Sequence, residues 1–111
     1  MSVRWKPKAI AATTATGNSR DYSSPDGVTR GNLIVNITGS PTGTSPAVVV
    51  KLQGKGSSGT YYDLPSAATS SLTAAGQTVV AVATLPKTWR AVWTVTGSTP
   101  SIVLGVDVDG V

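Results

Sequence analysis

Two stretches of the sequence follow the same pattern, WTVTGSTPSIVL at residues 93–104 and VNITGSPTGTSPAVVV at residues 35–50. Each alternates apolar with polar residues, reaches Thr-Gly-Ser, passes a turn that contains threonine and proline, and begins a second alternation. A period of two is typical of a β-strand, because successive side chains point to opposite faces of a sheet. We interpret the two stretches as equivalent corners of one β-sandwich. The longer copy, with PTG inserted, is expected to be the more exposed corner.

The alternation continues outward from both corners. The apolar residues that share a face are, in chain order, Leu33, Val35 and Ile37, then Val48, Val50 and Leu52, then Trp89, Ala91, Trp93 and Val95, and finally Ile102, Leu104, Val106 and Val108. A link rich in Gly, Ser and Pro, residues 39–46, separates the first two runs. Two alternating runs on either side of such a link predict an antiparallel pair of strands.

Further strands are expected at residues 9–16, at the Tyr-rich end of the segment 54–65, and at residues 79–85. Residues 17–27 are polar and are predicted to form a loop, and an irregular connection is expected over residues 66–77. The fold class predicted is therefore all-β, an antiparallel β-sandwich (Ig-like or jelly-roll-like) of about seven to eight short strands. We expect an extended N-terminal arm at residues 1–8 and a single sandwich domain at residues 9–111.

The composition offers little material for catalysis. The 111 residues include no His and no Cys, and no Glu appears in the sequence. An imidazole base, a thiolate nucleophile, a disulfide framework and the usual zinc sites are therefore excluded. We interpret Asp107 and Asp109 as the solvated end of a strand rather than as a pair of catalytic carboxylates. We expect a protein that is not an enzyme and has no catalytic residue, bound metal or cofactor.

The net charge of +4 is spread along the chain, and the nine basic residues cluster only at Arg4, Lys6 and Lys8. We interpret this charge as solvation, although a basic balance can also favour an acidic partner. Nucleic acid is not an expected partner, because aromatic and basic residues are interleaved only at residues 87–90. A membrane is not expected either, since no apolar run approaches the length of a membrane helix.

Two segments are the candidate partner-binding sites. The arm contributes Arg4, Trp5, Lys6, Pro7 and Lys8, and the Gly/Ser tip with its tyrosines contributes Gly54, Lys55, Tyr61 and Tyr62. Trp5 can dock on its own domain or on a neighbouring subunit, and the sequence leaves both open.

Trp89 and Trp93 share one strand face and are expected to fill the core, which has no Phe. A sugar-binding platform and the anchor of an interface are the alternatives, because Trp is enriched at binding surfaces.

Three segments resemble the small virion structural proteins of tailed bacteriophages: VVVKLQGKGSSGTYYDLPSA at residues 48–67, LTAAGQTVV at 72–80 and LPKTWRAVWTVTGSTPSIVLGVDV at 85–108. The shared features are a strand that ends in Lys-Leu-Gln, a Gly-rich tip with an aromatic pair and Asp-x-Pro, and an Arg flanked by aromatic residues and Val. A Gly-x-x-Pro-Ser turn follows before the last strand. The resemblance covers residues 47–106 best.

The resemblance implies a structural role on a phage particle and transfers no catalytic residue. It implies a capsid decoration (cement) protein that binds the outer surface of the head and bridges neighbouring capsid subunits, after assembly in the host cytoplasm. The implied partners are the major capsid protein and further copies of this chain, in a homo-oligomer such as a trimer. A tail or fibre-associated module of the same virion and a carbohydrate-binding β-sandwich are the alternatives.

Overall fold

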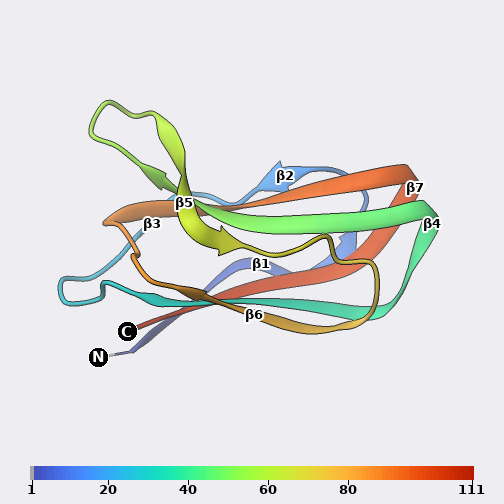
Figure 1. Cartoon of the computed structure of the whole chain (residues 1–111), viewed down its shortest axis with the longest axis horizontal. Helices are drawn as coiled ribbons and strands as arrows, with labels where there is room; N and C mark the ends of the chain where they lie inside the picture. The colour runs from blue at the N-terminus through green and yellow to red at the C-terminus, as the bar shows by residue number, and fades with distance from the viewer. Residues whose placement is uncertain (1) are drawn as a thin grey trace.

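Two long strands, β4 (Gly31–Lys55) and β7 (Thr88–Gly110), run side by side through the whole molecule and organise its fold (Figure 1). The computed structural model describes residues 2–111. The shorter strands are β1 (Val3–Thr13), β2 (Gly17–Asn18), β3 (Tyr22–Ser23), β5 (Tyr61–Ala68) and β6 (Gly76–Val82). All the pairings between strands are antiparallel, and the predicted all-β sandwich is confirmed. Residues 2–111 contain no helix long and apolar enough to cross a membrane.

Each long strand contributes to both layers of the sandwich. In the first sheet the order is β1, the second half of β7, the first half of β4, and β6. In the second sheet the order is β2 and β3, the first half of β7, the second half of β4, and β5. The two halves of β4 therefore pair with β7 and not with each other. The predicted antiparallel pair across residues 39–46 is wrong, because the chain crosses to the other sheet there instead of reversing.

The crossings occur at the repeated stretches. The register between β4 and β7 shifts between Thr38 and Ala47, and Thr44 lies opposite Ser98 at the centre of the bend. The equivalent segments are Gly-Thr-Ser-Pro at 43–46 and Gly-Ser-Thr-Pro at 97–100. Their first residues, Gly43 and Gly97, have φ of 107° and 111°. The interpretation as two equivalent corners is confirmed, although the longer copy aligns through Gly43 rather than through its Thr-Gly-Ser.

The order of the strands repeats within the chain. The long strand β4 follows β1, β2 and β3, and the long strand β7 follows β5 and β6. β1 pairs with the second half of β7 as β5 pairs with the second half of β4. β2 and β3 pair with the first half of β7 as β6 pairs with the first half of β4. The two halves of the chain are therefore related by an approximate two-fold axis between Thr44 and Ser98.

The core lies between the two sheets and contains the apolar residues that the alternation put on one face. The fully buried side chains include Leu33, Val35, Val48, Val50, Leu52, Trp89, Ala91, Ile102, Leu104, Val106 and Val108. Trp89 stacks on Tyr22 with a centroid distance of 5.0 Å and meets the edge of Trp5 at 5.1 Å. This aromatic cluster joins the sheets at the end of the sandwich where β1 and β7 begin.

The separate arm predicted at residues 1–8 is not observed. β1 begins at Val3 and continues unbroken past Lys8 to Thr13, paired with the second half of β7. Pro7 fits in this strand because it lies at a register shift, between the paired residues Trp5 and Lys8. Pro is found in sheets at such irregular positions and on edge strands, where its missing N–H matters least. The expected boundary after Lys8 thus falls inside a strand, and Met1 lies outside the described residues.

Candidate functional site

The candidate residues of β1 are held by their own domain. Arg4 donates two hydrogen bonds to Asp109, from Nε to Oδ1 at 2.6 Å and from an Nη atom to Oδ2 at 3.0 Å. These bonds lower the pKa of Asp109. Lys6 lies 3.6 Å from Asp107 in a second ion pair of the same kind. Both carboxylates at the end of β7 are therefore paired with cations of the neighbouring strand β1. The interpretation of Asp107 and Asp109 as a solvated strand end did not include these ion pairs.

Trp5 and Lys8 point toward the core side of β1. Trp5 docks on its own domain, over Trp89 and against Gly110, where a side chain on the glycine would collide with the indole. Lys8 donates from Nζ to the carbonyl oxygen of Leu104 at 3.1 Å and lies 5.8 Å from the ring centroid of Trp93. Its partial burial lowers its pKa. Of the two alternatives for Trp5, the structure shows the docking within the chain.

The candidate residues of the tip lie on the second sheet, where β4 and β5 form a hairpin. Tyr61 is paired with Lys55, and Tyr62 is paired with Gly54. Tyr62 covers Gly54 and is 46% exposed, whereas Tyr61 points to a cluster of polar side chains. The structure therefore brings Lys55 and Tyr61 into one site and leaves Tyr62 exposed on the opposite face of the strand.

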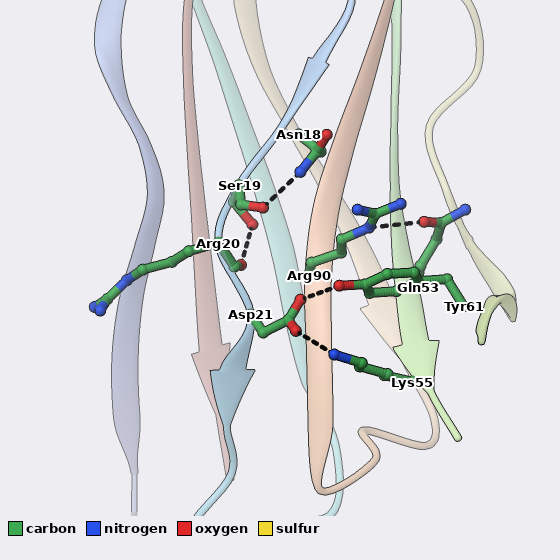
Figure 2. A network of polar contacts seen from close by, with 8 residues as sticks. All are labelled: Asn18, Ser19, Arg20, Asp21, Gln53, Lys55, Tyr61 and Arg90. Atoms are coloured by element: carbon green, nitrogen blue, oxygen red, sulfur yellow. Dashed lines mark hydrogen bonds and ion pairs between the residues drawn. The ribbon is translucent and has the colours of Figure 1, made fainter. Parts of the chain in front are cut away.

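That cluster, which we call the polar face, lies on the outward side of the second sheet, and Figure 2 shows its part around Asp21, Tyr61 and Arg90. Its members come from four separate segments: Asp21, Lys51, Gln53, Lys55, Tyr61, Asp63 and Arg90. Asp21 accepts a hydrogen bond from the Tyr61 hydroxyl at 2.7 Å and one from Lys55 at 3.1 Å. The hydrogen bond from Tyr61, followed by that from Lys55, lowers the pKa of Asp21.

Arg90 and Gln53 connect the two ends of the polar face. The Arg90 guanidinium lies 3.6 Å from the ring centroid of Tyr61, and its Nε donates to Gln53 at 3.0 Å. Gln53 in turn donates to Asp63 at 2.9 Å, and Lys51 donates to the other oxygen of Asp63 at 3.1 Å. These two bonds lower the pKa of Asp63, with the Gln53 bond the larger cause. Because each carboxylate of the face accepts hydrogen bonds from two neighbouring side chains, the face presents charges that are fixed in place.

Sequence reasoning found Lys55 and Tyr61 but missed Asp21 and Arg90 as members of this site. Asp21 comes from the segment between β2 and β3, which was predicted to be a loop. The alternation along the strand puts Arg90 on the face opposite to that of Trp89, and this is observed, since Trp89 is buried and Arg90 reaches the polar face. The alternation was the one available signal. It predicts on which side of the sheet the Arg90 side chain lies, but not which side chains it contacts there.

The two tryptophans of β7 do not form an exposed platform. Trp89 has no exposed surface, and its Nε1 donates to the Ser24 hydroxyl at 3.0 Å. Trp93 is half-buried, and a side chain on Gly17 would collide with its indole. The expected core role is confirmed for Trp89. A sugar platform built from both rings is not present.

The outward side of the first sheet carries three exposed apolar side chains that sequence reasoning missed. Ile10, Val79 and Val103 are 55%, 56% and 38% exposed. A shallow depression of about 280 Å³ lies beside Ile10 and over Gly105. Asn36 and Asp107 lie on the same side of the sheet, on the two strands between Val79 and Ile10. The three apolar side chains are therefore exposed singly, as is common on protein surfaces.

The class of protein that this geometry defines is an antiparallel β-sandwich in which two long strands cross between the sheets. No family model matches the sequence, and no curated protein matches it. The structure is similar to that of the SPBc2 prophage-derived protein YomS, with a TM-score of 0.52 and 16% identity over 98% of this chain and 93% of the other.

The structure is also similar to a chain in the structure of infectious bursal disease virus, Gx strain. The TM-score is 0.54 at 9% identity, over 99% of this chain and 31% of the viral chain. This chain thus spans about a third of the viral one. At such identities the likeness is one of fold, and a prophage-derived protein and a viral chain share it.

Proposed function

We propose that this chain is a non-enzymatic structural protein of a bacteriophage virion and decorates the outer surface of the head. The observation that carries the proposal is the match to the prophage-derived protein YomS, which extends over nearly the full length of both chains. The likeness to part of a chain from another virus supports it. Assembly would take place in the host cytoplasm.

In this proposal the two outward sides of the sandwich have different partners. The polar face and the tip, with Lys55, Tyr61 and Tyr62, contact the major capsid protein. The first sheet, on the opposite side, contacts further copies of this chain. A sandwich whose long strands belong to both sheets holds the two surfaces at a fixed distance. Many modest contacts of this kind become strong together, because each bound copy raises the effective concentration of the next.

Particles purified from the phage test the location directly. Quantitative mass spectrometry should give a copy number comparable to that of the major capsid protein, and electron microscopy should place the added density on the outside of the head. A few copies per particle, located at the tail or its fibres, would contradict the decoration role and support the role as a tail component.

Particles that lack the protein test the contact surface. Adding back the Lys55→Ala variant should give weaker binding than adding back the natural chain, because Lys55 belongs to the polar face. Lys87→Ala is the matched control, since Lys87 pairs with the fully exposed Asp26, which is not a member of that face. Equal binding by both variants would show that the polar face does not contribute to the contact with the capsid.

A further inference from the structure

The sandwich has four edges, and three of them are blocked. Edge strands leave backbone N–H and C=O groups unpaired, and natural proteins protect them with charges, prolines, bulges or short strands. β1 contains Pro7 between two lysines and has two register shifts. β5 contains Asp63 and Pro65, has a register shift, and includes Ser66 with φ of 55°. β2 and β3 have two residues each.

β6 has none of these protections. Its seven residues, Gly76–Val82, pair with β4 in an unbroken register from Gly31↔Val82 to Ile37↔Gly76. Within residues 2–111 its other side pairs with no strand. No charged residue occurs between Asp63 and Lys87, so the edge and the segments on either side of it are neutral.

The exposed side chain of Val79 lies where the centre of a contact along β6 would be. Val79 is the middle residue of β6, is 56% exposed, and points outward next to Ile34 of β4. A valine this exposed at the centre of an unprotected edge is buried if a further strand is added alongside. The added strand must be short, neutral and apolar, because a charged one would find no partner for its charges on β6.

We infer that β6 is a self-association edge, at which β6 of a second copy adds antiparallel about a two-fold axis through Val79. Strand β6 itself meets the requirements for the added strand. The axis places Val79 opposite Val79 of the second copy and Gln77 opposite its Ala81, and it joins the two first sheets into one. A two-fold contact uses the same surface on both copies and closes on itself. The oligomer is then a dimer and not the trimer expected from the sequence.

The inference concerns the isolated chain and is independent of where the chain sits on a particle. A seven-residue strand is about 24 Å long. Its edge alone buries less than the roughly 1,000 Å² of a stable interface. The dimer should therefore dissociate on dilution, and its formation on a particle would be favoured by the high local concentration.

Sedimentation velocity over about a hundredfold range of concentration tests the dimer. The natural chain should shift from monomer to dimer, and Val79→Lys should stay monomeric, because it places two like charges on the axis. Val103→Lys is the matched control: it changes an exposed valine on the same side of the same sheet, but on the central strand β7, and should leave the dimer intact. Thermal unfolding of all three establishes that they are folded. A monomer at every concentration, or a dimer or trimer that survives Val79→Lys, would overturn the inference.

Disulfide capture tests the register, and the chain suits it because it has no cysteine. Val79→Cys should cross-link to itself on mild oxidation, since residues opposite each other in antiparallel strands have Cα atoms about 4.5–5.5 Å apart. Gln77→Cys and Ala81→Cys should cross-link when the two variants are mixed. Neither should cross-link when oxidised alone, because the two cysteines of such a dimer lie about four residues apart along the strands, or about 14 Å. Val103→Cys should not cross-link. Cross-linking of Gln77→Cys alone, or of Val103→Cys as efficiently as Val79→Cys, contradicts the proposed pairing.

Discussion

At the scale of single residues, the corners depend on glycines that face each other's backbone. A Cβ atom on Gly43 would lie 2.6 Å from the carbonyl oxygen of Thr99, and one on Gly97 would lie 2.8 Å from the carbonyl oxygen of Ser45. Ser45 and Thr99 themselves have φ of 51° and 45°. They adopt the left-handed region without being glycine, at a cost of about 1–2 kcal/mol each. Each corner therefore has one residue that must be glycine and one that is strained.

Gly43→Ala and Gly97→Ala should each lower the free energy of unfolding by about 2–4 kcal/mol, because they add backbone strain and a collision with a carbonyl group. Urea denaturation followed by tryptophan fluorescence measures the change. Gly39→Ala is the control, since Gly39 has φ of 71° and open space around its Cα. It should lose only about 1 kcal/mol. Equal losses at all three glycines would show that the close approach at the corner contributes nothing.

At the scale of elements, β1 shows how an edge strand can be part of the core. Its Trp5 lies between the sheets, its Arg4 and Lys6 pair with carboxylates of β7, and its Lys8 caps a carbonyl oxygen. The first half of the strand is therefore held from both sides of the sheet. Removing it would open one end of the sandwich and expose Trp89.

Deletion of residues 2–8 should lower the melting temperature and shift the tryptophan emission to longer wavelength, because Trp89 loses its cover. Trp5→Ala alone should remove much of the same stability, about 2–4 kcal/mol. Arg4→Ala should have a small effect, since exposed ion pairs contribute little. A deletion variant that melts at the temperature of the natural chain would show that β1 is a dispensable arm after all.

The apolar alternation predicted most of the fold, since it placed Leu33, Val50 and Leu104 on the buried side of their strands. It did not predict that one strand continues through a corner. Gly and Pro usually end a strand, and the bend depends on a second bent strand, β7, beside β4. That partner is far away in the sequence, so no local pattern identifies it.

The candidate site was predicted less well than the fold for the same reason. Tyr61 and Lys55 are close in the sequence, and they were recognised together. Asp21 binds both residues but comes from a distant segment. It precedes Lys55 by 34 residues and Tyr61 by 40 residues. Side chains from separate strands meet only when the order of strands in the sheet is known.

At the scale of the whole molecule, the two halves of the chain are intertwined. β1 of the first half pairs with β7 of the second, and β5 of the second half pairs with β4 of the first. The longest interface in the molecule is the one between β4 and β7. Neither half can bury its apolar side chains by itself, although the two have the same order of strands.

Peptides of residues 1–57 and 58–111 should therefore be unfolded separately and fold when mixed. Chains of about 60 residues bury too little surface to be more than marginally stable, and each peptide here also lacks its partner strands. Far-ultraviolet circular dichroism of the peptides and of their mixture measures the effect. A folded signal from either peptide alone would show that the halves are independent units.

The approximate two-fold axis also relates the loop at residues 56–60 to the ends of the chain. Lys55 is paired with Tyr61 at one side of this loop, as Gly110 is paired with Val3 where the chain ends. A short linker between the ends would thus repeat the existing loop, and a new opening at residues 56–60 would repeat the existing ends. The fold is consequently suited to circular permutation, in which β5, β6 and β7 precede β1, β2, β3 and β4 and every strand keeps its neighbours.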